Sequence, residues 1–260
     1  MILIIESSAD YPSVAISDHQ GRIVWDKICL DRQSHSEKLP LLVQEALNFI
    51  DDQKYMVCSN IGPLSAVAVS QGPGSYTGLR IGTSLAKGLC YSKNIPLISV
   101  SGFWGMGNWL LNEFAHIDMV FALLDARRDE VYIQRVNRGE TLKGRFEIDY
   151  LSDNEYPSLL KNGIQQVESR ILNAETLEWM NVNDWNCVGF IGNSNEKALR
   201  ILNEYMVVNP GVVFSEAPVA YMFGEESAYK WKQNIFEDMA YFEPFYLKDF
   251  VPGISTKFKI

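Results

Sequence analysis

The segment from Ser65 to Cys90 constrains the fold more than any other part of the chain. It opens with the apolar run Ala66–Val69, whose length and β-branched content are typical of a buried strand. Gln71-Gly72-Pro73-Gly74 then interrupts regular structure, because glycine permits positive φ and proline fixes its own. Apolar residues next recur at helical spacing, and Ser75 or Thr77 stands where it could cap that helix. The segment therefore predicts a strand, a glycine-rich turn and a helix.

Three interpretations of this segment remain open from residue types alone. A glycine-rich turn before a helix can hold a phosphate on free N–H groups, although this one lacks the Gly-Lys-Ser/Thr ending of a P-loop and the dinucleotide spacing. Gly78, Gly82 and Ala86 lie four residues apart, a ridge of small residues that the backbone of a partner helix could approach. In the third interpretation, both features only pack the interior of the chain.

Charge and composition narrow the classes of function. The net charge of −9 argues against nucleic-acid binding by this chain alone, because binding phosphates requires concentrated Lys and Arg. The basic residues between Arg127 and Arg145, Arg138 among them, alternate with acidic ones and predict a solvated hairpin in preference to a tRNA contact. The four cysteines show no C-x-x-C spacing, so we expect reduced core residues and neither disulfides nor a zinc site.

No apolar run reaches the roughly 18 residues that a membrane-spanning helix requires. The N-terminus has no basic region before its first apolar run, so it does not resemble a signal peptide. We therefore expect a cytoplasmic protein without membrane contact.

The remaining patterns predict two α/β halves, residues 1–102 and 103–260. We expect strands at 2–5, 14–16, 23–29, 66–69, 96–100, 119–124, 131–136 and 187–191, and helices after Ser34, from Gly78, and at 103–114, 196–205 and 219–231. Ser34 and Glu37 match a capping box, and Pro40 predicts a kink or a restart in the first of these helices. Residues 137–185 predict only strand fragments with a helix.

Four motifs carry a resemblance to a known family. They are Arg32-x-x-His35-Ser36-Glu37-x-Leu39-Pro40, the eleven residues Gly72 to Gly82, Ala86-Lys87-Gly88-Leu89, and Leu124-Asp125-Ala126-Arg127-x-x-Glu130-Val131-Tyr132. Together they closely resemble the TsaB (YeaZ) family, and Tyr246-Leu247-Lys248 is similar to that family's ending Tyr-Leu-Arg. The resemblance is specific over residues 2 to 132 and weak from there to about 240.

The resemblance implies an actin-like ATPase fold (ASKHA, ribonuclease H-like) with two βββαβα-type halves, the second one reduced. It implies a non-catalytic subunit of the complex that transfers threonylcarbamoyl to N6 of adenosine 37 in tRNAs reading ANN codons. The implied partners are the catalytic subunit TsaD, in a heterodimer, and the ATPase TsaE, with tRNA reached only through the complex. The predicted partner surface would also permit a homodimer when that partner is absent.

The residues are consistent with a non-catalytic chain. Actin-like kinases hold phosphates with two hairpin loops, each with an acidic residue and a glycine, and neither Glu6-Ser7-Ser8-Ala9 nor Asp125-Ala126-Arg127-Arg128 contains a glycine. The catalytic paralogue carries two metal-binding histidines where this chain has Gly102 and Met106. We therefore expect no cofactor and no metal. An independent small-molecule kinase or ATP hydrolase is the alternative, and no metal or activated nucleophile supports a peptidase.

The predicted partner surface lies on the helix after Ser34 and the helix after the glycine-rich turn. Its candidate residues are His35, Glu37, Leu42, Gly74, Ser75, Thr77, Gly78, Arg80, Gly82, Ala86 and Lys87. In a two-fold or pseudo-two-fold contact this helical face would meet the matching face of the partner.

Overall fold

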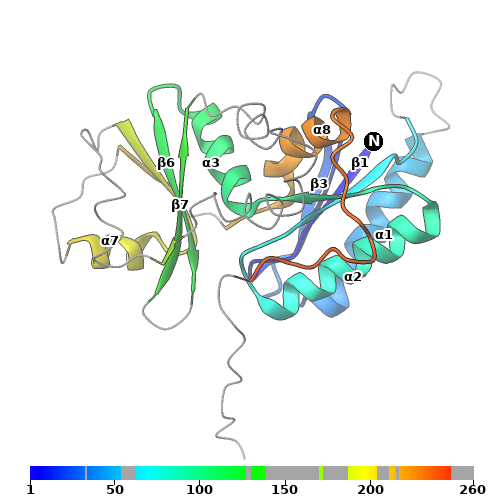
Figure 1. The fold of residues 1–260 in the computed structure, drawn as a ribbon, viewed down its shortest axis with the longest axis horizontal. Helices are drawn as coiled ribbons and strands as arrows, with labels where there is room; N and C mark the ends of the chain where they lie inside the picture. Colours follow the sequence, from blue (N-terminus) through cyan, green and yellow to red (C-terminus); the bar gives the residue numbers. More distant parts are fainter. Residues whose placement is uncertain are drawn as a thin grey trace, which may run out of the picture.

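Two five-stranded sheets with the same internal order make up the fold in the computed structural model (Figure 1). The structure describes residues 1–32, 34–53, 62–126, 130–138, 170–171, 187–203, 211–214 and 217–246. The first sheet has the order β3-β2-β1-β4-β5 and the second the order β10-β9-β6-β7-β8. In both, three antiparallel strands are followed by two strands that pair in parallel. The same strand order is thus duplicated in the two halves.

The first sheet is covered on one face by two helices. Its strands are β1 (Ile2–Glu6), β2 (Ser13–Ser17), β3 (Ile23–Ile28), β4 (Ala66–Ser70) and β5 (Leu97–Val100), and its helices are α1 (His35–Gln53) and α2 (Tyr76–Lys93). Alternate residues of β1 and β4 point to opposite faces, so Leu3 and Val67 pack under α1 and α2 while Ile4 and Ala68 face the second half. Figure 1 shows α1 and α2 side by side on the outer face.

The helix starts test the capping predictions. Ser75 caps α2, because its hydroxyl accepts a hydrogen bond from the Gly78 N–H at 3.2 Å. The predicted capping box at Ser34 is wrong: its hydroxyl donates to the Asp31 carbonyl at 2.7 Å instead. Helix α1 runs through Pro40 as one element, so the predicted restart of the helix at this residue is wrong.

The second sheet is built from residues after 118. Its strands are β6 (Met119–Asp125), β7 (Val131–Asn137), β8 (Arg170–Ile171), β9 (Val188–Gly192) and β10 (Val212–Phe214), and α7 (Asn195–Asn203) follows β9. A small core that includes Phe121 and Phe190 joins this sheet to α7. Most of the stretch 137–185, for which strand fragments and a helix were predicted, lies outside the described residues.

The two halves exchange their last helices. Helix α3 (Gly102–Glu113) follows β5 of the first sheet but packs on β6, β7 and β9 of the second. The short helix η2 (Ala220–Phe223) and α8 (Gly224–Lys232) follow β10 but pack on β1, β2 and β5 of the first. The largest core cluster, which includes Phe103 and Phe223, fills the space between the sheets. The division into domains at residue 102 stays a prediction; α8, which lies after that boundary in the sequence, packs on the first sheet.

Helix α3 is held by charged side chains at both ends. Glu226 accepts a hydrogen bond from the backbone N–H of Ser101, the residue that caps α3, at 3.0 Å. At the other end the Arg138 guanidinium donates to the carbonyls of Leu111, Phe114 and Ile117 at 2.7 to 2.8 Å. Both charges complement the helix dipole. Arg138, predicted to lie on a solvated hairpin, therefore has a structural role.

No helix within the described ranges is both long and apolar enough to cross a membrane.

Candidate functional site

Glu6 ends β1 and is completely buried. Its Oε1 accepts a hydrogen bond from the Ser8 N–H, and the Ala9 backbone and the Ser70 hydroxyl also hydrogen bond to the carboxyl group. Burial raises the pKa of this carboxyl above its ordinary value, and these hydrogen bonds oppose the shift. The first of the two acidic loop positions thus points into the protein, where Oε1 is held by its own loop and Oε2 is buried without a hydrogen-bond partner among the described residues.

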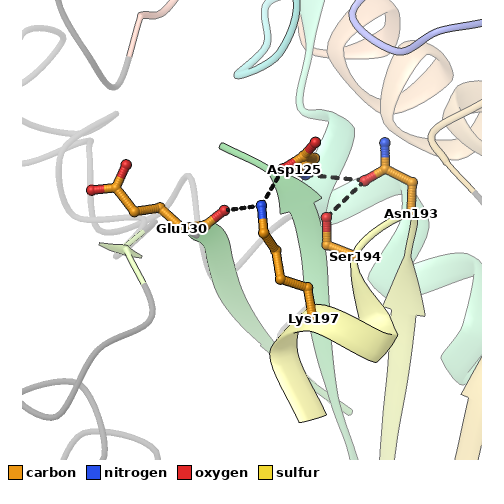
Figure 2. Close-up of polar contacts among 5 residues, drawn as sticks. All are labelled: Asp125, Glu130, Asn193, Ser194 and Lys197. Carbon is orange, nitrogen blue, oxygen red and sulfur yellow. Dashed lines mark hydrogen bonds and ion pairs between the residues drawn. The ribbon is translucent and has the colours of Figure 1, made fainter. Parts of the chain in front are cut away.

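Asp125 occupies the equivalent position at the end of β6 (Figure 2). Lys197, from the first turn of α7, donates to Asp125 Oδ1 at 2.7 Å and to the Glu130 carbonyl at 3.0 Å. The Asn193 side-chain oxygen accepts from the Asp125 N–H at 3.0 Å and from the Ser194 hydroxyl at 3.2 Å. A polar, open cavity of about 360 Å³ is lined by Asp125, Lys197 and the residues from Asn193 to Glu196. The second acidic position is thus neutralised by an internal cation.

Both positions lie where ligands usually bind in α/β sheets. β1 and β4 are adjacent parallel strands, and the chain continues from them toward opposite edges of the sheet, to β2 beside β1 and to β5 beside β4. β6 and β9 repeat this arrangement with β7 and β10. The crevice at the carboxyl ends of such strands is the common binding position. In this chain the Glu6 carboxylate is buried at this position of the first sheet, and the Asp125–Lys197 pair lines the open cavity at this position of the second.

Gly102 and Met106, which stand where the paralogue has its metal ligands, both lie in the interior at the start of α3. A Cβ on Gly102 would meet Pro218 at 3.7 Å, and Met106 belongs to the core between the sheets. Across the described ranges, no three His, Cys, Asp or Glu side chains gather as a metal site. That the protein binds no metal stays a prediction.

The ridge of small residues on α2 faces the chain itself. A Cβ on Gly78 would lie 2.1 Å from the Ser7 carbonyl oxygen, and a Cβ on Gly82 would lie 2.1 Å from the Ser7 hydroxyl. Ala86 is fully buried under the first sheet. This corrects the expectation of a ridge open to a partner helix, because the loop after β1 is the backbone that comes close. Of the three interpretations, packing of the chain's own interior holds for this ridge.

The other candidate residues divide by burial. His35 is buried and hydrogen bonds to the Ala9 backbone, and Leu42 is buried in the core under α1. Contrary to the prediction, neither side chain is open to a partner. A Cβ on Gly74 would lie 2.3 Å from the Ser8 carbonyl oxygen, and Ser75 is occupied as the α2 cap. The residues that reach the surface are Glu37, Thr77 and Arg80, which are exposed, and Lys87, which is half-buried.

The exposed face of α1 and α2 contains residues that the sequence reasoning did not select. Leu41 on α1 and Tyr91 on α2 are 58% and 83% exposed, although both are large and apolar or aromatic. Gly88 is exposed in the middle of α2, and a Cβ there would meet nothing within 4 Å. A glycine inside a helix costs about 1 kcal/mol relative to alanine, and no contact with the described residues requires this one. Its only signal in the sequence is its place in the Ala86–Leu89 motif.

A C-terminal segment, Glu237 to Tyr246, lies across the edge of the first sheet and the start of α2. Its Glu237 N–H donates to the Leu97 carbonyl at 2.9 Å and its Phe245 N–H to the Gln71 carbonyl at 2.7 Å. The rings of Tyr246 and Tyr76 are 5.0 Å apart between centroids. Figure 1 shows this segment, in orange to red, passing from α8 to α2.

Arg80 connects α2 to this segment. Its guanidinium lies 4.4 Å from the centre of the Tyr76 ring and hydrogen bonds to the Tyr246 hydroxyl, which raises the pKa of Arg80. Lys87 lies 6.0 Å from the centre of the buried Phe242 ring. Sequence reasoning selected both cations but not the aromatic residues that hold them.

Comparison with known proteins relates the chain to one family. The family model for TsaD, tRNA N6-adenosine threonylcarbamoyltransferase, matches residues 30–256. A protein of Escherichia coli (strain K12) named tRNA threonylcarbamoyladenosine biosynthesis protein TsaB is 30% identical over 141 residues, which are 54% of this chain and 56% of that protein. The protein of the same name from Bacillus subtilis (strain 168) is 33% identical over 134 residues, 50% of this chain and 52% of that protein. The chain thus spans about half the length of these curated relatives.

The fold is shared over nearly the whole chain with a solved structure. This is an uncharacterized protein of Pseudomonas aeruginosa with similarity to peptidase YeaZ, which superposes with a TM-score of 0.65 at 21% identity. The match covers 95% of this chain and 99% of that one. With the duplicated strand order, it confirms the predicted fold class.

Proposed function

Because the chain belongs to the TsaD family and is similar to proteins named TsaB over about half its length, we propose that it is a TsaB-type, non-catalytic subunit in threonylcarbamoyladenosine biosynthesis. In this proposal it binds and supports a TsaD-type transferase that modifies N6 of adenosine 37 in tRNAs reading ANN codons. A TsaE-type ATPase joins the complex, and tRNA is reached only through it.

The observation that carries the non-catalytic part is the internal use of both loop-end carboxylates. Glu6 accepts hydrogen bonds from its own loop and Asp125 is paired with Lys197. A nucleotide with its metal ion needs such carboxylates and the adjacent backbone N–H groups for itself. In this chain the Glu6 carboxylate bonds to the Ser8 N–H and the Asp125 carboxylate bonds to Lys197, which supports a subunit that shapes a complex.

The exposed face of α1 and α2 is the proposed partner surface. Helix α2 has three basic side chains and no acidic one, whereas α1 has four acidic side chains and one basic. A two-fold or pseudo-two-fold axis along these helices would place α2 of one chain over the α1 equivalent of the other, basic against acidic. A TsaD-type partner matches this arrangement because it shares the family's fold, and a second copy does so when that partner is absent.

Gly88 provides the test of this surface, and Gly82 provides a matched control on the same helix. Gly88→Leu adds a side chain to open space, so the melting temperature should stay constant or rise, while affinity for the co-purified TsaD-type subunit should fall about ten-fold or more. Gly82→Leu would collide with Ser7, so its melting temperature should fall. Calorimetry and thermal unfolding measure both, and a tRNA-modification assay with and without the chain measures the activity of the complex.

Two outcomes would contradict the proposal. If Gly88→Leu binds the transferase subunit as tightly as the unmodified chain, the α1–α2 face is not the partner surface. If the unmodified chain neither binds that subunit nor stimulates tRNA modification, the assignment as its subunit fails.

The alternative function, a small-molecule kinase or ATP hydrolase, has one observation in its favour. The cavity beside Asp125 lies at the N-terminal end of α7, where free backbone N–H groups favour an anion. A nucleotide there would have to displace Lys197 from Asp125. Turnover of ATP by the isolated chain discriminates between the two functions.

A further inference from the structure

Arg80 is a cation whose position on the exposed face of α2 is fixed by aromatic residues. It stacks on Tyr76 one turn earlier in the helix and donates to the hydroxyl of Tyr246, which comes from the C-terminal segment. An exposed arginine ordinarily loses much side-chain freedom when it binds a partner. Here the contacts within the chain already restrict that freedom, so less entropy remains to be lost on binding.

The stack leaves the guanidinium at the surface, and among the residues that the structure describes Glu243 is the acidic group whose charge acts on it. Arg80 is exposed, and the neighbouring charge that raises its pKa comes from Glu243, which is also exposed. A guanidinium has five N–H donors in a planar fork that matches a carboxylate. Arginine and tyrosine are also the residue types that most often dominate binding energy at protein interfaces.

We propose that Arg80, positioned by Tyr76 and Tyr246, is an anchor of the partner surface that binds a carboxylate of the transferase subunit, so that the C-terminal segment is part of the interface. This inference rests on the proposed function. A pseudo-two-fold contact would place the partner's helix equivalent to α1 over α2, and α1 is the acidic helix of this chain's own two-helix face. We therefore place the carboxylate on that helix of the partner. A tRNA phosphate is the competing anion, and the net charge of −9 disfavours it.

Four variants test the inference, each measured for affinity to the transferase subunit by calorimetry at low and high salt. Arg80→Ala should weaken binding about ten-fold to a hundred-fold, the range of a charge-assisted hydrogen bond, and should reduce the salt dependence. Arg80→Lys should recover part of the loss, because the charge remains and the planar fork is lost. Tyr246→Phe, which removes only the hydroxyl, should weaken binding several-fold. Lys232→Ala is the control, since it removes an exposed cation at the end of α8, on the opposite face of the first sheet.

A double variant shows whether Tyr246 acts through Arg80. In the Arg80→Ala background, Tyr246→Phe should have no further effect, and independent losses would overturn its positioning role. Unchanged affinity in Arg80→Ala would overturn the anchor while leaving the proposed function intact, whereas absence of binding by the unmodified chain would overturn the proposed function. If Arg80→Ala instead weakens only binding of tRNA to the complex, the anion is a phosphate and the inference is wrong.

Discussion

Replacing Lys230 by methionine should destabilise the protein more than any ordinary loss of a surface charge. The Lys230 ammonium lies 3.1 Å from Glu226 Oε1 and donates to the Ser99 carbonyl at 2.8 Å. Their side chains are only 8% and 4% exposed. Lys230→Met therefore leaves the Glu226 carboxylate buried without its cation, which costs about 3–5 kcal/mol when a buried pair is broken.

The Ser101 N–H keeps its hydrogen bond to Glu226, so the lower end of this range applies, about 3 kcal/mol. For a chain of this size that corresponds to a melting temperature lower by roughly 6–12 °C. Lys197→Met is the matched control, because the Asp125–Lys197 pair is 50% and 19% exposed and should contribute about 1 kcal/mol or less. Urea unfolding and calorimetry measure both variants.

Removing the second charge tests the cause. Lys230→Met with Glu226→Gln keeps an acceptor for Ser101 and leaves no buried charge, so it should recover more than half of the lost stability. The reasoning is refuted if Lys230→Met costs no more than Lys197→Met, or if the double variant loses the sum of the two single losses.

Two further predictions concern the acidic loop ends. Burial raises the pKa of Glu6, so the folded state holds this proton more tightly than the unfolded state. The stability that Glu6 contributes is therefore complete below its ordinary pKa of 4.5 and is lost as the pH rises from there to the folded value. Glu6→Gln should remove that decline. If the free energy of unfolding changed in the same way with pH from 4 to 8 in both proteins, the prediction would be contradicted. Because Lys197 neutralises Asp125, the isolated chain should bind ATP weakly at most and release no phosphate from it, and turnover that scales with protein concentration would favour the kinase alternative.

Strand positions in the first half could be predicted from the sequence because each is a short apolar run bounded by turn residues. The direction in which the α2 ridge faces could not be predicted from the sequence, since spacing alone places Gly78 and Gly82 on one face of the helix without showing what lies against that face. The loop that approaches them, at Ser7, is distant in sequence. The same limit applies to Leu41 and Leu42, which are adjacent and equally apolar, yet only Leu41 is exposed. Tyr246 was missed as a partner of Arg80 because it lies far along the chain.

The exchange of α3 and α8 has a consequence for biosynthesis. As the chain leaves the ribosome, β1 to β5 are complete at residue 100, but the helix that covers their inner face, α8, begins only at residue 224. Until then the apolar residues of that face, such as Ile4 and Ala68, have no covering layer of their own half. Contacts of such large sequence separation form late and slowly, and an uncovered sheet face is prone to aggregation or to binding by chaperones. We therefore expect the nascent first half to need protection until almost the whole chain has been made.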